Sequence, residues 1–134
     1  MASAQVLDFS DTEVRRILAH GPWPMPWSPD PSNRLSGRPD AIAWGERLFF
    51  EPRLSSSGGV PCATCHVPFR AWQDGRPRGV GLEEGERNTP GLLDVRLHRW
   101  FGWDGAQDSL WAQSLRPILD PKEMNGSIAA TAGI

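Results

Sequence analysis

A chain of 134 residues with 39% hydrophobic and 22% charged side chains is long enough to bury a core, which excludes a disordered polymer. Its net charge of −2 gives no electrostatic basis for binding nucleic acid, and no apolar run is long enough for a membrane span. Seven tryptophans without a tyrosine suit a chain that packs around a large flat group.

The N-terminal segment, residues 1–39, is expected to form a short helix and a proline-rich arm. Ser10 and Glu13 have the spacing of a capping box, and apolar residues at helical spacing predict a helix over residues 11–20. Residues 21–39 contain six prolines and two tryptophans, so we expect an extended arm along the domain surface.

Residues 40–134 are expected to form the main domain, with its first helix over residues 40–50. This helix carries an apolar stripe formed by Ile42, Gly45, Leu48 and Phe49. Glycine costs about 1 kcal/mol against alanine inside a helix, so we expect Gly45 to permit the close approach of another element.

Two loops and a second helix complete the expected domain. Residues 53–61 and 72–91 are rich in glycine, proline and serine or charge, and a loop as long as the second is usually functional. Residues 106–119 predict a helix that Pro117 ends or kinks. With no alternation typical of strands, the fold class is predicted to be all-α with long loops.

Both cysteines lie in the sequence CATCH, where His66 directly follows the second. A structural zinc site needs four ligands, and the other histidines, His20 and His98, are distant. A redox dithiol would need a preceding strand, which the sequence does not predict. Attachment of haem c explains all five positions, because Cys62 and Cys65 share a helical face and His66 can ligate the iron from the same side.

A single haem leaves the function open between classes. Met124 follows His66 by 58 residues and could return as a sixth ligand, which would indicate a mono-haem electron-transfer cytochrome. An open side opposite His66 would instead admit peroxide. A fragment without haem, with a structural or interaction role only, is the third alternative.

Two longer stretches carry a family resemblance. GERLFFEPRLSSSGGVPCATCHVPFRAWQDGRP and GERNTPGLLDVRLHRWFGWDGAQDSLWAQSLRPILDPKEM fall within residues 40–125. They resemble the N-terminal haem domain of bacterial di-haem cytochrome c peroxidases, and in particular the MauG-type and MbnH-type enzymes. The resemblance implies one covalent haem c in this chain, which reacts with peroxide, and a second in a longer protein.

The resemblance also implies roles for individual residues. Cys62, Cys65 and His66 would hold the peroxide-reactive haem, and Trp103 matches a tryptophan between the two haems. The residues that line the distal pocket in the family are matched here by Gln113, Pro117 and Glu123. A calcium ligand of the family is matched by Asn88.

The chemistry of these residue types agrees with such roles. Splitting peroxide requires a proton to move between its two oxygens, and Glu123 could carry it while Gln113 orients the molecule. An indole such as Trp103 can relay electrons. Each residue also has an ordinary structural explanation: core packing for Trp103, a helix-terminal acid for Glu123, a solvated side chain for Gln113 and a turn cap for Asn88.

Two features depart from the family pattern. No histidine lies between His66 and His98, where classical members carry one that caps the resting iron, so we expect a five-coordinate haem. No second CxxCH is present, and the chain ends on small residues, so we expect a piece of a longer protein that lacks its C-terminal haem domain.

The expected partners are hydrogen peroxide and an electron-donor protein or protein substrate. Because haem c is attached in the periplasm in most bacteria, the expected location is periplasmic, although the first residues show no signal peptide.

Overall fold

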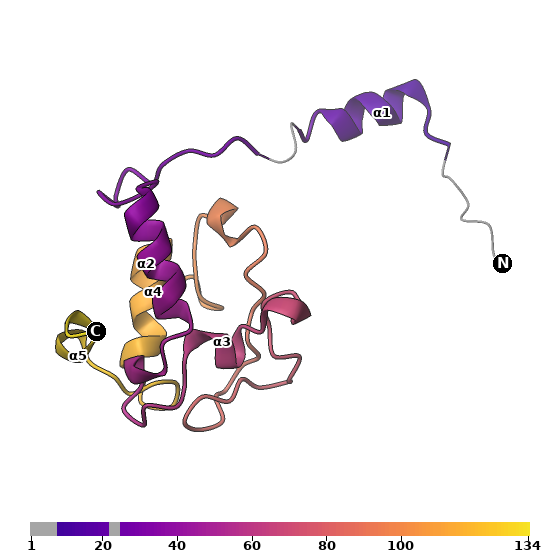
Figure 1. The fold of residues 1–134 in the computed structure, drawn as a ribbon. Coiled ribbons are helices and arrows are strands. Elements are labelled where there is room, and N and C mark those ends of the chain that lie inside the picture. Colours follow the sequence, from indigo (N-terminus) through magenta and orange to yellow (C-terminus); the bar gives the residue numbers. More distant parts are fainter. Residues whose placement is uncertain (1–7, 22–24) are drawn as a thin grey trace. The chain divides into compact units, whose positions relative to one another are not determined.

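The computed structural model describes residues 8–21 and 25–134. The chain forms two compact units, residues 1–30 and residues 31–134 (Figure 1). Within the described residues there are helices, turns and loops and no strand, which agrees with the expected helical class.

The first unit contains helix α1, Asp11–Leu18. The Ser10 hydroxyl accepts a hydrogen bond from the Glu13 amide, and the Glu13 carboxylate accepts one from the Ser10 amide at 2.8 Å. The predicted helix and its capping box are therefore confirmed, and α1 ends two residues early. Trp23 of the predicted arm lies outside the described residues, and the course of the arm along the surface stays a prediction.

The second unit begins with turns over residues 31–37 that are linked to a helix far along the chain. The amide of Ser36 donates to the carbonyl oxygen of Asn33 at 2.9 Å, which closes one of these turns. The indole Nε1 of Trp111 donates to the hydroxyl of Ser32 at 3.0 Å. This bond holds the start of the unit against the first turn of α4, which begins at Leu110.

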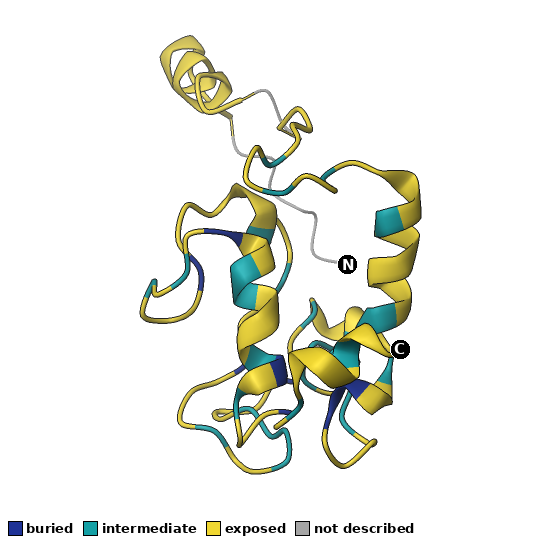
Figure 2. Ribbon diagram, turned by 90° about the vertical axis from the view of Figure 1, so that its left-hand side faces the viewer, coloured by how far each residue is buried: buried dark blue, intermediate teal, exposed yellow. Residues whose placement is uncertain are grey.

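Two longer helices, α2 (Pro39–Phe49) and α4 (Leu110–Leu119), form most of the regular structure of this unit. They overlap in Figure 1 and stand apart along much of their length in Figure 2. Their C-terminal parts meet in the core, where Leu48 of α2 packs against a cluster that includes Ile118 of α4. Pro39 at the start of α2 suits a first helical turn, which needs no amide donor at that position.

The remaining helical segments are short. They are η1 (Pro52–Leu54), α3 (Cys62–Cys65), η2 (Pro68–Arg70), η3 (Val95–Leu97) and α5 (Ile128–Ala132). Helix α5 lies against η1. The sequence interpretation missed α5, because its short run of Ile, Ala and Thr forms no clear apolar stripe. Ser127 caps the helix by accepting from the Ala130 amide at 3.1 Å.

The core of the unit is small. Leu54, Ile118 and Met124 form one buried cluster, and the few dark blue segments in Figure 2 show how little else is buried. Burying such side chains stabilises a fold by about 1.5–3 kcal/mol each. This cluster joins η1, α4 and the segment before α5.

The structure tests two sequence expectations about the helices, and the one about Gly45 was wrong. A Cβ on Gly45 would meet no atom within 4 Å, so this glycine permits no close approach. Helix α4 begins at Leu110, within the range predicted over residues 106–119. Of the two predicted effects of Pro117, an end of the helix is ruled out, because α4 continues to Leu119 and the Asp120 amide still donates to the Arg116 carbonyl at 2.9 Å; a kink stays a prediction. The long loop over residues 72–91 is confirmed, with a single isolated bridge between Val80 and Glu84.

Candidate functional site

The CATCH motif forms one turn of helix. Helix α3 begins after Pro61 and covers Cys62–Cys65, and the amide of His66 closes it by donating to the Cys62 carbonyl at 3.0 Å. Residues three apart in a helix lie on one face, so both thiols can reach the same planar group. Both cysteines are free and partly buried.

The imidazole of His66 is oriented by a backbone carbonyl. Its Nδ1 lies 3.0 Å from the carbonyl oxygen of Trp72. A carbonyl can only accept, so Nδ1 carries the proton and the lone pair stands on Nε2. Such a hydrogen bond fixes the tautomer and orientation that a metal-ligating histidine needs.

This carbonyl is held in place by strained backbone. Ala71 has φ 55° and Trp72 has φ 59°, left-handed values that cost about 1–2 kcal/mol for each residue with a side chain. The Trp72 amide donates to the Val67 carbonyl at 3.1 Å, which closes the loop. The rings of Trp72 and Phe49 form an edge-to-face pair with a centroid distance of 5.5 Å. Strain of this kind clusters at functional sites.

The second cysteine faces the long loop. The Cys65 thiol donates to the Val80 carbonyl at 3.4 Å. Burial raises the pKa of the Cys65 thiol, and the negative charges of Asp74 and Glu123 raise it further. Burial likewise raises the pKa of Cys62. Both raised pKa values disfavour the thiolate form, which zinc binding and dithiol exchange need.

No alternative metal site assembles around the motif. Within the part of the chain that the structure describes, no group of three or more His, Cys, Asp or Glu side chains could hold a metal ion. Asn88, the predicted calcium ligand, is exposed, and its backbone carbonyl accepts a hydrogen bond from Trp103. Its calcium role stays a prediction.

Gln113 lies on the inward side of α4 and is half-buried. Its Oε1 is buried and has no hydrogen-bond partner among the described residues. A buried acceptor without a donor costs about 1–3 kcal/mol, so such an atom calls for a partner molecule. Pro117 follows one turn later, also half-buried, and has no amide to offer the Gln113 carbonyl.

Glu123 is held by its backbone against the long loop. The Leu82 amide donates to the Glu123 carbonyl at 2.9 Å, and a Cβ on Gly81 would lie 2.7 Å from the Glu123 Cα. Although the residue is exposed at one side, burial raises the pKa of its carboxyl group; the negative charge of Asp120 adds to this, and Arg116 opposes it. A carboxyl group with a raised pKa is suited to proton transfer.

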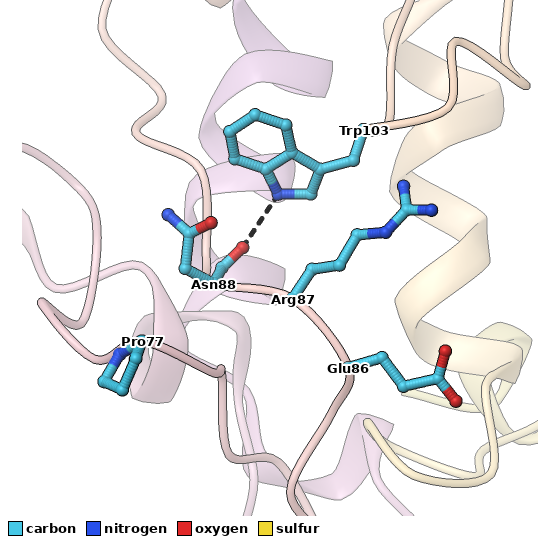
Figure 3. A pocket seen from close by; sticks show the side chains of 5 residues that line it. All are labelled: Pro77, Glu86, Arg87, Asn88 and Trp103. Carbon is cyan, nitrogen blue, oxygen red and sulfur yellow. Dashed lines mark hydrogen bonds between the residues drawn. The ribbon is translucent and has the colours of Figure 1, made fainter.

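Trp103 stands at the tip of a small loop and lines an open pocket (Figure 3). Its indole Nε1 donates to the Asn88 carbonyl at 2.9 Å, and 57% of the residue is exposed. Pro77, Glu86 and Arg87 complete the pocket. The sequence interpretation did not foresee the contact with Asn88, because fifteen residues separate the partners.

Met124 points into the core. It is only 3% exposed and packs with Leu54 and Ile118. Its carbonyl accepts from the Ser56 amide at 2.9 Å. Core packing therefore accounts for this methionine.

The profile of one protein family, described as di-haem cytochrome c peroxidase, matches residues 39–133. The chain belongs to this family. It is 49% identical over 92 residues to the methylamine utilization protein MauG of Methylorubrum extorquens, which covers 67% of the chain and 26% of MauG. It is 33% identical over 104 residues to the cytochrome c551 peroxidase of Pseudomonas aeruginosa, covering 74% of the chain and 30% of the relative.

Solved structures of the same family have the same fold. A MauG-like protein associated with microbial copper homeostasis superimposes with a TM-score of 0.68 over 84% of this chain and 35% of that protein, at 31% identity. The di-haem peroxidase BthA of Burkholderia thailandensis gives a TM-score of 0.62 over 78% of this chain and 29% of BthA, at 32% identity. The chain spans about a quarter of the length of the curated relatives that it matches.

A di-haem cytochrome family implies haem c as the cofactor, and the residues present fit that group. The set suited to it consists of two free thiols on one helical face, an imidazole whose Nδ1 is hydrogen-bonded, and a buried acceptor without a partner at Gln113. The sequence analysis did not single out Trp72, because this residue orients His66 through its backbone carbonyl and not through its side chain. Neither Ala71 nor Trp72 is a residue type that favours left-handed backbone.

Proposed function

We propose that this chain is the peroxide-reactive haem domain of a di-haem cytochrome c peroxidase-like oxidoreductase. The observation that carries the proposal is the buried, partnerless Oε1 of Gln113, because an acceptor in this position suits an O–H donor such as hydrogen peroxide. Haem c, when bound, supplies the iron at which the O–O bond is split.

The thiols of Cys62 and Cys65 attach the haem, and His66 ligates its iron through Nε2. The hydrogen bond from Nδ1 to Trp72 keeps the ring in the required tautomer. Because the carbonyl sits on strained backbone, the imidazole is held in one orientation. One haem is proposed for this chain and a second for the remainder of the protein.

On the opposite side Gln113 and Glu123 act on the peroxide, with Pro117 lining the same space. Gln113 Oε1 accepts a hydrogen bond from the peroxide and orients it. The Glu123 carboxylate would take the proton from one peroxide oxygen and return it to the other, which could then leave as water; the haem, when bound, would supply the electrons for this cleavage. Burial raises the pKa of this carboxyl group above its ordinary value, which makes it a better proton acceptor than an exposed glutamate.

Trp103 is proposed as the exit for oxidising equivalents toward the second haem. An exposed indole with its Nε1 fixed on Asn88 provides a rigid, oxidisable ring at the surface. The proposed partners are hydrogen peroxide, an electron-donor protein or protein substrate, and the C-terminal haem domain. A calcium ion bound by Asn88 and a periplasmic location belong to the same proposal. Within residues 8–21 and 25–134, no helix is both long and apolar enough to cross a bilayer.

The test is the ferric spectrum of the haem-loaded chain, produced together with haem c maturation machinery. We expect a high-spin spectrum that changes when hydrogen peroxide is added. A low-spin spectrum with a methionine–iron charge-transfer band would instead establish the electron-transfer alternative with His66 and Met124 as ligands. A chain that takes up no haem would refute both.

Two variants sharpen this test. Met124→Leu conserves volume in the core and removes the sulfur, so the spectrum should not change if Met124 only packs. Gln113→Leu removes the orphaned acceptor, and we expect peroxide to react about tenfold or more slowly while haem loading is retained.

A further inference from the structure

Residues 101–107, here termed the Trp103 loop, close on themselves. The amides of Phe101 and Gln107 each donate to the carbonyl of the other, at 2.9 and 3.2 Å. The Gly105 amide donates to the Gly102 carbonyl at 3.2 Å. Phe101 is buried and fixes the base of the loop, so its tip carries Trp103 as a compact unit.

The tip of this loop is held from two directions. On one side Trp103 donates to the Asn88 carbonyl at 2.9 Å. On the other side Asp104 Oδ1 accepts from the Ala106 amide and from the guanidinium Nη1 of Arg116, each at 3.2 Å. Arg116 belongs to α4, so its ion pair with Asp104 connects the loop to the helix that carries Gln113.

Gly102 marks the point where these groups converge. A Cβ at this position would lie 2.9 Å from Asp104 Oδ1, 3.0 Å from Arg116 Nη1 and 3.3 Å from Gln113 Oε1. Gly102 also has φ +80°, which favours glycine. Because Gly102 has no side chain, the ion pair of Asp104 and Arg116 and the side-chain amide of Gln113 can all lie close to its Cα.

Charge supports the same grouping. The Ala106 amide and then the Arg116 guanidinium lower the pKa of Asp104, so this carboxylate stays charged. Arg116 also opposes the rise in the pKa of Glu123. The positive charge of Arg116 thus lowers the pKa of Asp104 in the loop and counteracts the raised pKa of Glu123, the proposed proton carrier.

We propose that Arg116 is a positioning residue whose ion pair with Asp104 holds the Trp103 loop against α4, so that Trp103 and Gln113 keep a fixed spacing. The expected effect of Arg116 on the reaction with peroxide rests on the proposed function. The claim that Arg116 holds the Trp103 loop against α4 does not. The pair is partly exposed, with side-chain exposures of 44% and 42%, so each partner is open to substitution without disrupting the core.

The experiment is hydrogen exchange measured by mass spectrometry on the haem-loaded chain. Arg116→Met keeps the aliphatic stem and removes the charge, and amides of residues 101–107 should exchange about three- to fivefold faster, the range expected for loss of an exposed ion pair. Asp104→Asn should have the same effect, and the double variant should add nothing further. Arg116→Lys should restore most of the protection.

A matched control is Arg78→Met, which removes another exposed guanidinium, paired with Glu84 at 3.1 Å. Loop exchange should then equal that of the parent chain. Unchanged loop exchange in Arg116→Met, or equal acceleration in Arg78→Met, would overturn the proposal.

A second measurement follows the reaction with peroxide. Arg116→Met should slow it about threefold, in step with the loosening of the loop, and Arg116→Lys should recover it. If the parent chain does not react with peroxide at all, the proposed function fails, while the exchange data still decide whether Arg116 positions the loop.

Discussion

The imidazole Nδ1 of His66 lies 3.0 Å from the backbone carbonyl oxygen of Trp72, and two consecutive left-handed residues bring that carbonyl into place. The proposed ligand to the haem iron is therefore oriented by a backbone carbonyl. This arrangement combines a neutral acceptor with local strain, and both can be tested by substitution.

Replacing Ala71 by glycine should stabilise the protein. Ala71 has φ 55°, and glycine removes about 1–2 kcal/mol of left-handed strain at a cost of about 0.5–1 kcal/mol of extra freedom in the unfolded chain. The free energy of unfolding in urea should rise by about 0.5–1 kcal/mol. Ala43→Gly inside α2 is the control and should lower it by about 1 kcal/mol. A loss of stability in Ala71→Gly would refute the strain argument.

Two glycines should respond in opposite ways to alanine. A Cβ on Gly81 would press on the backbone of Glu123, so Gly81→Ala should destabilise the protein by about 1–3 kcal/mol. Gly45 has open space around it inside α2, and Gly45→Ala should stabilise by about 0.5–1 kcal/mol. Thermal unfolding of both variants measures the difference, and equal midpoints would contradict it.

The pair of Glu51 and Arg53 should make stability depend on pH in acid. Glu51 accepts from the backbone and side chain of Arg53, which lowers its pKa from 4.5 to about 2. The stabilisation is complete above the unfolded value near 4.5 and is lost as pH falls through about 2. Parent and Glu51→Gln chains should therefore differ in urea midpoint at pH 6 and converge toward pH 2. A difference that persists at pH 2 would be inconsistent with this explanation.

Glu123→Gln should slow the reaction of the haem-loaded chain with hydrogen peroxide by about a hundredfold, the usual scale for a lost general acid–base group. Haem content and the ferric spectrum should stay as in the parent chain. Glu84→Gln, which neutralises an exposed carboxylate of the adjoining loop, provides the control and should react normally. Normal kinetics in Glu123→Gln would remove its proposed role.

Much of the local structure could be predicted from the sequence. The features that depend on neighbours within a few residues include the capping box of Ser10 and Glu13, the helix predicted over residues 40–50, which α2 matches within one residue, and the long loop over residues 72–91. The same is true of the single helical turn that places Cys62 and Cys65 on one face. Hydrogen bonds and steric limits of this range are encoded locally, so a reader of the sequence can foresee them.

The arrangement of the site required the tertiary structure. The contacts of Trp103 with Asn88 and of Trp111 with Ser32 join residues 15 and 79 positions apart. The convergence of Asp104, Arg116 and Gln113 over Gly102 depends equally on how a loop meets α4. Packing also decides which face of α4 turns inward. The apolar side chains of Leu110 and Leu115 remain exposed, whereas the polar Gln113 is half-buried, which is the reverse of what hydrophobicity alone would suggest.

The sequence by itself therefore determined the family, the presence of a CxxCH motif and the helical class, because these depend on residue identities at short, ordered spacings. Only the tertiary structure decided which carbonyl orients His66, which acceptor is left without a partner and which cation holds the Trp103 loop. The physical reason is that these are contacts across space, and their formation depends on the path of the whole chain, including strained backbone that no propensity favours.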